Sequence, residues 1–269
     1  MKAIKHIRAG LLHIEVIGTI PDGSQKKRRR GARTKTTSAA MQFYNNKCSW
    51  QELELIIANN FGIGDTVVTL TYDDTHLPDN KNAAKQRIRK FLRKLREVRK
   101  RRGEELRYIY VTEGFHRAED SAPFGQDTSW ENGRLHHHMV VNSREVEELR
   151  SLWECGEIRA EPVDIHYYRE LAKYLTKEAR EFGRAKPGER TWCCSRSVDR
   201  RIAVAYIELP LDGVTLTAPE GAIDYIQFHE KNPYGYADCI GARYLLYPVE
   251  IRPTPCYAIG RKPQIASWF

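Results

Sequence analysis

The chain has 269 residues, of which 41% are hydrophobic and 29% charged, and this balance allows a packed core and excludes a wholly disordered chain. Its formal net charge is +9, and a protein this basic commonly binds a polyanion, most often nucleic acid, with a merely basic surface as the alternative. No run of about 18 apolar residues predicts a membrane span, and the basic start of the chain lacks the cleavage site of a secretion signal.

Six cysteines are spread along the chain, and no two of them form a Cys-x-x-Cys pair. The spacing gives no support to a structural zinc site, and a chain with a conventional core does not need disulfides. A reducing cytoplasm is the compartment that this cysteine usage favours.

The N-terminal part contains a cationic run in which residues Lys26 to Arg30 are all basic. The run predicts a solvated loop, with a phosphate-binding arm as the functional alternative. A helix is predicted from Ser49 to Asn59, with Ser49 as its N-cap and Glu52 three positions later.

A strand and a basic helix are predicted next. Residues Asp65–Tyr72 are nearly all β-branched, aromatic or apolar, which is typical of a strand. From Ala83 to Arg102 apolar residues recur at spacings of three and four, which predicts a helix. Its other face is almost entirely basic, with Glu97 as its one acid, and this favours phosphate contact over a merely solvated face.

Strand and helix segments alternate through the rest of the central region. Leu106–Thr112 and Leu135–Val141 predict strands on either side of a long polar loop. Glu145–Glu154 and Arg169–Phe182 predict helices. Beyond about Arg200, short strands and prolines predict a β-rich extension. The interleaving predicts an α+β fold with a mainly antiparallel central sheet flanked by helices.

Three consecutive histidines occupy the second of these strands. Because alternate side chains of a strand share a face, His136 and His138 point the same way and His137 points to the opposite face. Two imidazoles on one face can bind one metal ion, whereas the structural alternative is a run of surface histidines. The apolar residues that follow directly favour the metal site.

A hard oxygen ligand would complete such a site for magnesium or manganese. Glu113 follows directly on the preceding strand, so it lies beside the histidines if the two strands pair as neighbours. An ordinary acid at a strand end is the alternative interpretation.

Tyr174 and Lys177 are three residues apart on a predicted helix and so share a face. A tyrosine phenol has an ordinary pKa of about 10 and is a weak nucleophile unless a cation or metal favours its ionised form. A lone Tyr-x-x-Lys pattern more often belongs to a core or a surface than to a catalytic site.

In combination and order, these patterns resemble the three motifs of the HUH endonuclease superfamily, and in particular the rolling-circle replication initiators of small bacterial viruses and plasmids. Val67–Pro78 is similar to the first motif, Gly133–Val141 to the second and Ala172–Lys177 to the third. Thr191–Arg196 is similar to a segment that follows the third motif in many such proteins. The resemblance covers about residues 60–200.

The resemblance implies an RRM-like palm as the central sheet, and it sets the expected domain limits. Residues 1–59 are expected to be a basic N-terminal segment packed on or leading into the core. Residues 60–210 are expected to be the HUH endonuclease domain, and residues 211–269 a C-terminal extension to which the resemblance assigns no role.

The resemblance also implies a role for each candidate residue. His136 and His138 bind a divalent metal ion, Mg²⁺ or Mn²⁺, with Glu113 as the third ligand. Tyr174 attacks the scissile phosphate, and Lys177 steadies the phosphate or the phenolate. The basic candidates for DNA binding are Lys27, Arg28, Arg29, Arg30, Arg89, Arg93, Arg96, Arg134 and Arg196.

Two positions depart from the motifs. The middle residue of the second motif is usually hydrophobic but is His137 here, which leaves open which two histidines bind the metal. Some initiators carry a second catalytic tyrosine four residues before the first, where this chain has Glu170, so a single-tyrosine enzyme is expected. Tyr167 and Tyr168 are interpreted as structural.

The implied chemistry leaves a 5′-phosphotyrosine and a free 3′-hydroxyl that primes rolling-circle replication, and a later 3′-hydroxyl rejoins the strand. The expected substrate is single-stranded DNA or an extruded origin hairpin in the cytoplasm of a bacterial host. The chain has no Gly-x-x-x-x-Gly-Lys-Ser/Thr loop, so a host helicase and polymerase are implied by analogy. The alternatives are a transposase or relaxase of the same superfamily, a non-catalytic nucleic-acid-binding protein, and, last, a metal-binding protein without a nucleic-acid role.

Overall fold

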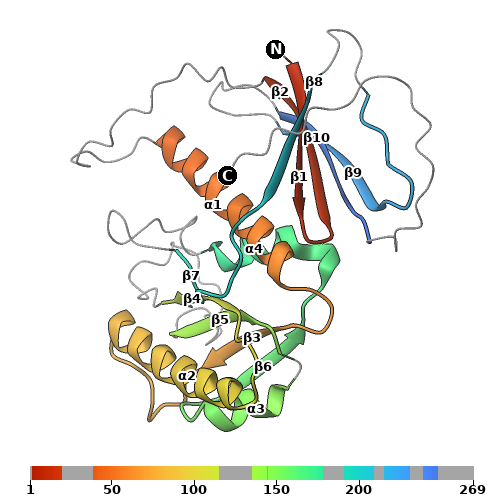
Figure 1. Ribbon diagram of the computed structural model, residues 1–269. Coiled ribbons are helices and arrows are strands. Elements are labelled where there is room, and N and C mark those ends of the chain that lie inside the picture. Colours follow the sequence, from red (N-terminus) through yellow and green to blue (C-terminus); the bar gives the residue numbers. More distant parts are fainter. Residues whose placement is uncertain are drawn as a thin grey trace. The chain divides into compact units, whose positions relative to one another are not determined.

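The computed structural model describes residues 2–19, 39–114, 135–143, 145–177, 191–208, 215–230 and 239–247. The chain divides into two compact units, one of residues Phe43–Asp199 and one that combines Met1–Gln42 with Arg200–Phe269. Within the described ranges each unit is built on a five-stranded antiparallel sheet, and four α-helices accompany the sheets (Figure 1). The predicted α+β class with mainly antiparallel sheet is confirmed.

The sheet of the larger unit has the strand order β6-β3-β5-β4-β7. Its strands are β3 (Thr66–Thr71), β4 (Tyr108–Glu113), β5 (His136–Val141), β6 (Ile158–Pro162) and β7 (Cys193–Cys194). The central strand β5 pairs antiparallel with β3 on one side and β4 on the other. The strands predicted from the β-branched and apolar runs are therefore neighbours.

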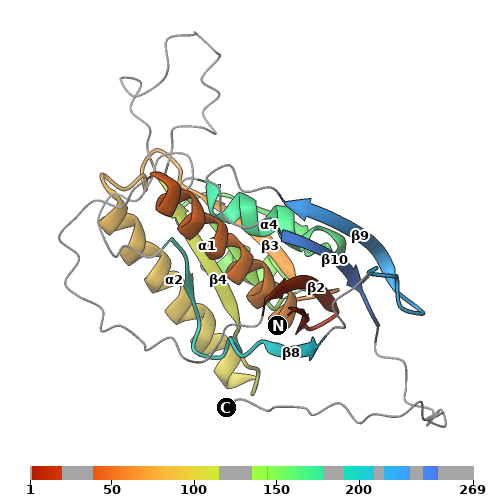
Figure 2. The ribbon, with the colours of Figure 1, turned by 90° about the horizontal axis from the view of Figure 1, so that it is seen from above.

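Helices cover both faces of this sheet. Helices α2 (Lys81–Arg101) and α3 (Val146–Leu152) pack on one face, where Leu70, Met139 and Leu95 are fully buried. On the other face lies α4 (Tyr168–Leu175), preceded by the 3-10 helix η3 (Ile165–Tyr167). Seen from above, α4 and α1 (Ala39–Asn60) lie side by side over the strands (Figure 2).

The limits of two helices differ from their prediction. Helix α1 begins ten residues earlier than expected, at Ala39, so Ser49 lies inside the helix and is not its N-cap. Helix α4 ends at Leu175, with Thr176 as its C-cap, and residues 178–182 of the predicted helix lie outside the described residues. No described helix combines the length and the apolar character that crossing a membrane requires.

A buried arginine joins α2 to α3. Arg99, whose side chain is 8% exposed, donates from Nε to Glu148 at 2.9 Å, from Nη1 to Glu104 at 2.7 Å and from Nη2 to Ser143 Oγ at 2.6 Å. Glu148 is itself 7% exposed. An ion pair this buried is costly to break from one side, because the remaining charge stays desolvated.

Replacing Arg99 by glutamine is expected to lower the free energy of unfolding by about 3 kcal/mol, because Glu148 and Ser143 lose a buried partner. The matched control is Arg93→Gln on the exposed side of the same helix, which should change stability by less than about 0.5 kcal/mol. Urea unfolding followed by circular dichroism measures both. Equal losses in the two variants would show that the Arg99 ion pairs contribute nothing beyond helix propensity.

The smaller unit joins the two ends of the described chain. Its sheet has the order β8-β1-β2-β10-β9. The strands are β1 (Lys2–Ala9), β2 (Leu12–Thr19), β8 (Ala203–Glu208), β9 (Ile223–Glu230) and β10 (Cys239–Leu245). The predicted β-rich character of the C-terminal part is confirmed, and the hairpin β1–β2, which the sequence analysis did not predict, pairs with it. The expected functional limits at residues 59 and 210 stay predictions.

The β1–β2 hairpin turns at a glycine. Gly10 has φ 57°, and the pair Ala9–Leu12 closes a two-residue loop. A positive φ at the first loop position is typical of a type II′ turn, which suits the twist of antiparallel strands and favours glycine there.

Candidate metal centre and active site

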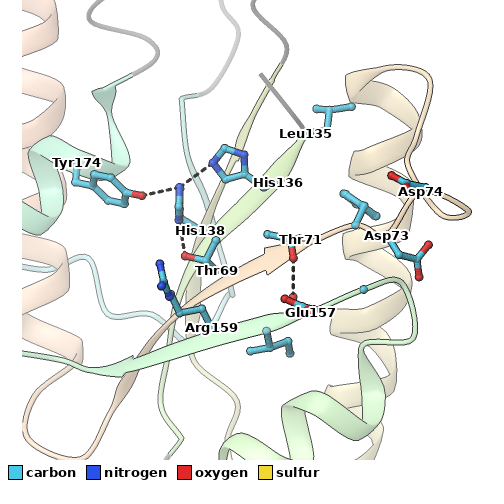
Figure 3. Close-up of a pocket in the computed structure, with 13 residues that line it drawn as sticks. Thr69, Thr71, Asp73, Asp74, Leu135, His136, His138, Glu157, Arg159 and Tyr174 are labelled. Atoms are coloured by element: carbon cyan, nitrogen blue, oxygen red, sulfur yellow. Dashed lines mark hydrogen bonds between the residues drawn. The ribbon is translucent and has the colours of Figure 1, made fainter. Parts of the chain in front are cut away.

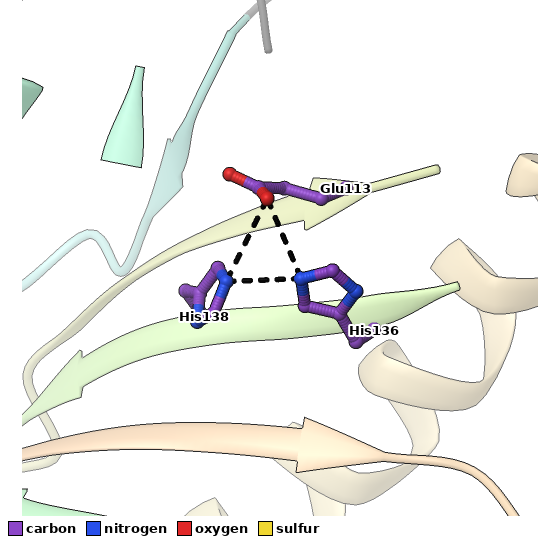
Figure 4. Close-up of side chains that lie close together, drawn as sticks. All are labelled: Glu113, His136 and His138. Atoms are coloured by element: carbon purple, nitrogen blue, oxygen red, sulfur yellow. Dashed lines mark hydrogen bonds and ion pairs between the residues drawn. The ribbon is translucent and has the colours of Figure 1, made fainter. Parts of the chain in front are cut away.

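The β4–β5 register places an acid beside two histidines. Glu113 is directly opposite His136, and His138 lies two residues further along β5 on the same face. His136 Nε2 is 3.0 Å from His138 Nε2, and Glu113 Oε2 lies 3.4 Å from the first and 3.7 Å from the second (Figure 4). The strand pairing on which the sequence prediction depended is therefore present.

These three side chains fit a divalent cation. Their candidate ligand atoms all lie within 4.8 Å of one another. Neighbouring ligands at about 2.1 Å from an octahedral ion are about 3 Å apart, which is close to the observed spacing. In addition, Glu113 Oε1 is buried without a hydrogen-bond partner, and a bound cation would satisfy that oxygen. The set of two imidazoles and one carboxylate forms a possible metal site, and the preference between Mg²⁺ and Mn²⁺ stays a prediction.

The carboxylate of Glu113 is held in its charged form. Burial by itself raises its pKa, but hydrogen bonds and charge interactions with His136 and His138 outweigh burial and lower the pKa to about 2. Glu113 is thus a full negative charge at any pH at which the protein would work.

A threonine of β3 orients His138. Thr69 is the cross-strand partner of His138, and its Oγ1 lies 3.0 Å from His138 Nδ1. If Nδ1 carries the proton and donates to Thr69, Nε2 keeps its lone pair directed at the cluster. Such an outer hydrogen bond is the usual way in which a metal-ligating histidine is fixed in one tautomer.

His137 faces the opposite side of the sheet, as the strand alternation predicts. It is fully buried, with Nε2 at 2.6 Å from the Tyr72 hydroxyl and Nδ1 at 2.9 Å from Thr112 Oγ1. Burial, and then the nearby His136 and His138, lower its pKa to about 3. His137 is therefore a neutral histidine of the core, and the possible metal site uses the other two.

Replacing His137 by leucine is expected to lower the free energy of unfolding by about 1–3 kcal/mol at pH 7.5, because Tyr72 and Thr112 lose a buried partner. The folded pKa lies below the ordinary value of about 6.5, so the stability that the neutral ring contributes is complete above pH 6.5 and is lost as the pH falls towards 3. Between pH 7.5 and 5.0 the unmodified protein should lose about 1–2 kcal/mol more than the variant. Urea unfolding in the presence of a chelator measures this difference, and parallel pH curves would contradict it.

Tyr174 reaches the histidine cluster from α4. Its hydroxyl oxygen is 2.9 Å from His138 Nε2, and the two rings are 4.7 Å apart between centroids (Figure 3). Tyr174 is 45% exposed, so a large substrate can approach it. Tyr168, by contrast, is buried and donates its hydroxyl to the Phe61 carbonyl at 2.7 Å, whereas Tyr167 is 59% exposed.

A cavity of about 600 Å³ opens beside the cluster and is lined by His136, His138 and Tyr174. Arg159 of β6 also lines it, because Arg159 is opposite Thr69 in the sheet and so shares the face of His138. The sequence analysis missed Arg159, since the short segment that forms β6 carries only a weak strand pattern. Lys177 lies beyond the C-cap of α4, is exposed, and is not among the residues that line this cavity.

The basic candidates separate into two groups. Arg89, Arg93 and Arg96 are exposed on α2, and Arg196 is exposed after β7. These four lie away from the cavity beside Tyr174 and line other hollows of the same unit. The remaining candidates lie outside the described residues and are Lys27, Arg28, Arg29, Arg30 and Arg134.

Residues 65–179 match a family model whose description is a replication-associated protein of the ORF2 type. No curated protein and no solved structure matches the chain. The matched segment begins at β3 and ends just after α4, so it contains Glu113, His136, His138 and Tyr174. The match supports a replication-associated protein of the rolling-circle type, which acts on DNA.

Proposed function

We propose that this protein is a replication initiator that nicks one strand of origin DNA through Tyr174 and keeps the cut 5′ end as a phosphotyrosine. The free 3′-hydroxyl then primes rolling-circle replication, and a later 3′-hydroxyl reverses the reaction. The observation that carries the proposal is the 2.9 Å approach of the Tyr174 hydroxyl to His138, at the edge of a cluster that can hold a metal ion.

The proposed chemistry is in-line transfer of a phosphoryl group. The Tyr174 oxygen forms a bond to phosphorus while the bond from phosphorus to the 3′ oxygen breaks. The phenol loses its proton and the leaving oxygen gains one, so one phosphodiester replaces another and no nucleotide cofactor is consumed. Because Tyr174 is exposed, an unpaired strand can enter the cavity and present its backbone to the phenol.

Charge in the transition state needs positive partners. Glu113, His136 and His138 are the residues that would hold a Mg²⁺ or Mn²⁺ ion, which supplies charge neutralisation at the non-bridging phosphate oxygens. Arg159, which lines the cavity, adds a guanidinium that can bind the same phosphate. Lys177 is proposed to steady the phosphate or the phenolate from the end of α4.

A transposase or relaxase would share this geometry, and the match to a replication-associated family favours the initiator. A non-catalytic DNA-binding protein would not need the phenol beside the metal cluster. We place the protein in the cytoplasm of a bacterial host, where a helicase and a polymerase would continue from the 3′-hydroxyl.

The test is a covalent-adduct assay with single-stranded DNA from the native replicon and Mn²⁺, resolved on a denaturing gel. With the label at the 3′ end of the DNA, the proposal predicts a labelled protein band, because the piece downstream of the cut stays on the tyrosine. With the label at the 5′ end, it predicts a shorter free strand whose 3′-hydroxyl a polymerase can extend. Tight DNA binding with no band and no cleavage would instead favour the non-catalytic DNA-binding protein.

A further inference from the structure

Helix α2 carries its positive charges in two different environments. On the side facing α3, Lys94 pairs with Glu154 at 2.7 Å, and Arg99 and Arg102 pair with Glu148. The opposite side presents Arg89, Arg93 and Arg96, which recur at spacings of four and three and so form one row. Among the described residues none of these three forms an ion pair, so their charge is available to a partner.

The row borders a groove that continues past the helix. One hollow of about 660 Å³ is lined by Arg89, Arg93 and Arg96 together with Tyr108 and Tyr110. A second hollow of about 680 Å³ shares Arg96 and Tyr108 with the first and extends to Arg196. Four arginines from two separate chain segments therefore line one continuous groove, and Glu105 is its one acidic lining residue.

The groove lies on the face of the sheet opposite to the candidate active site. Tyr110 is the cross-strand partner of Met139, so both point towards α2, whereas His138, the next residue on β5, points towards α4. A phosphate bound by the arginine row therefore cannot be the phosphate that Tyr174 attacks. The groove must bind a different part of a DNA molecule.

The chemistry of the groove suits a phosphate backbone and not exposed bases. Guanidinium groups bind phosphate oxygens in pairs of hydrogen bonds. The seven residues from Arg89 to Arg96 rise by about 10 Å, a length over which one strand of a duplex carries about three phosphates. The two tyrosines are only 8% and 6% exposed, so they offer no surface on which unpaired bases could stack.

We propose that this groove binds the backbone of duplex DNA, so that the protein holds double-stranded DNA flanking the strand that it nicks. The placement beside an origin rests on the proposed function, whereas the preference for a duplex backbone rests on the arginine row and the buried tyrosines.

The test compares two triple variants with equal loss of charge. Arg89→Gln, Arg93→Gln and Arg96→Gln remove the row, whereas Arg87→Gln, Lys94→Gln and Arg101→Gln remove three cations from the other side of the same helix. Binding of a fluorescent 20-base-pair duplex is measured by anisotropy at several salt concentrations. Loss of the row should weaken binding about 10–100-fold and flatten the slope of log affinity against log salt by about 3, with much smaller effects in the control. Equal losses in both variants would overturn the proposal.

A second measurement uses the unmodified protein. Cys193 and Cys194 line the groove as thiols outside any disulfide, and Cys48 is such a thiol on α1 outside the groove. Duplex at ten times its Kd should slow alkylation of the Cys193–Cys194 peptide about tenfold and leave Cys48 unchanged. Unchanged alkylation of all three thiols at saturation would also contradict the groove.

Adduct formation on a short single-stranded oligonucleotide separates the two proposals. The row variant should form adduct at the unmodified rate, because the oligonucleotide has no duplex to bind. If no protein forms an adduct but the duplex results hold, the groove stands and the nicking function fails. If adduct forms but both triple variants bind duplex alike, the nicking function stands and the groove fails.

Discussion

Replacing Tyr174 by phenylalanine is expected to abolish the covalent adduct, with a loss of at least about 10³-fold in the rate of strand cleavage. The variant removes only the oxygen that would attack phosphorus. The aromatic ring remains, so the contact with the His138 ring, 4.7 Å away, can persist and the fold should be unaffected. The measurement is the initial rate of adduct formation on labelled single-stranded DNA, together with the Kd for the same DNA.

The matched control is Tyr167→Phe, because Tyr167 is also exposed and lies seven residues earlier, at the N-cap of α4. Tyr168 is a poorer control, since its buried hydroxyl bonds to Phe61 and its loss would destabilise the unit. We expect Tyr167→Phe to form adduct normally and Tyr174→Phe to bind DNA with unchanged Kd. Adduct formation that survives in Tyr174→Phe but disappears in Tyr167→Phe would move the nucleophile to Tyr167.

Replacing His138 by alanine is expected to remove metal binding and to slow strand cleavage by about 10²–10⁴-fold, because charge neutralisation by a catalytic metal contributes several kcal/mol. His138 is 3% exposed and contacts His136, Thr69 and Tyr174, so it is the centre of the site. Isothermal titration with Mn²⁺ measures affinity, and the adduct assay measures activity on the same samples.

The neighbouring residue provides the control for this second prediction. His137→Leu alters the adjacent imidazole on the other face of the sheet, so it should keep Mn²⁺ affinity although it lowers stability. Metal affinity of the unmodified protein should also fall on acidification, because imidazole must be neutral to bind a metal. Retained Mn²⁺ affinity in His138→Ala, with affinity lost in His137→Leu, would assign the metal to the wrong face in the present account.

The candidate site was predictable where it depends on local pattern. The alternation of a strand is enough to separate His136 and His138 from His137, and the structure places the rings on the two faces accordingly. Glu113 needed one further assumption, that sequential strands separated by a long loop are neighbours, and the β4–β5 pairing bears it out. The proximity of Tyr174 followed from the resemblance and not from the Tyr-x-x-Lys spacing.

Features that depend on distant parts of the chain were not predictable in the same way. Arg159 reaches the site because β6 pairs with the far side of β3, and nothing within residues 158–162 indicates that partner. Thr69 was part of a recognised motif, but its bond to His138 depends on the β3–β5 register.

The smaller unit shows the same limit for the fold. Its β1–β2 hairpin carries a local signal, since Gly10 separates two segments of mixed apolar and polar residues, yet basic side chains such as Lys5 and Arg8 obscured the alternation. The pairing of that hairpin with β8 and β10 joins residues about 200 positions apart. Such pairings are selected by packing of the whole sheet, which no short window of sequence contains.

The most direct test of the nicking mechanism is to identify the residue that carries the DNA. The protein is incubated with single-stranded origin DNA and Mn²⁺, the DNA is digested to a nucleotide stub, and tryptic peptides are sequenced by mass spectrometry. The account predicts a 5′-linked nucleotide on Tyr174 and on no other residue. A nucleotide on Tyr167, on a serine or a histidine, or the absence of any modified peptide from DNA that has been cut would contradict it.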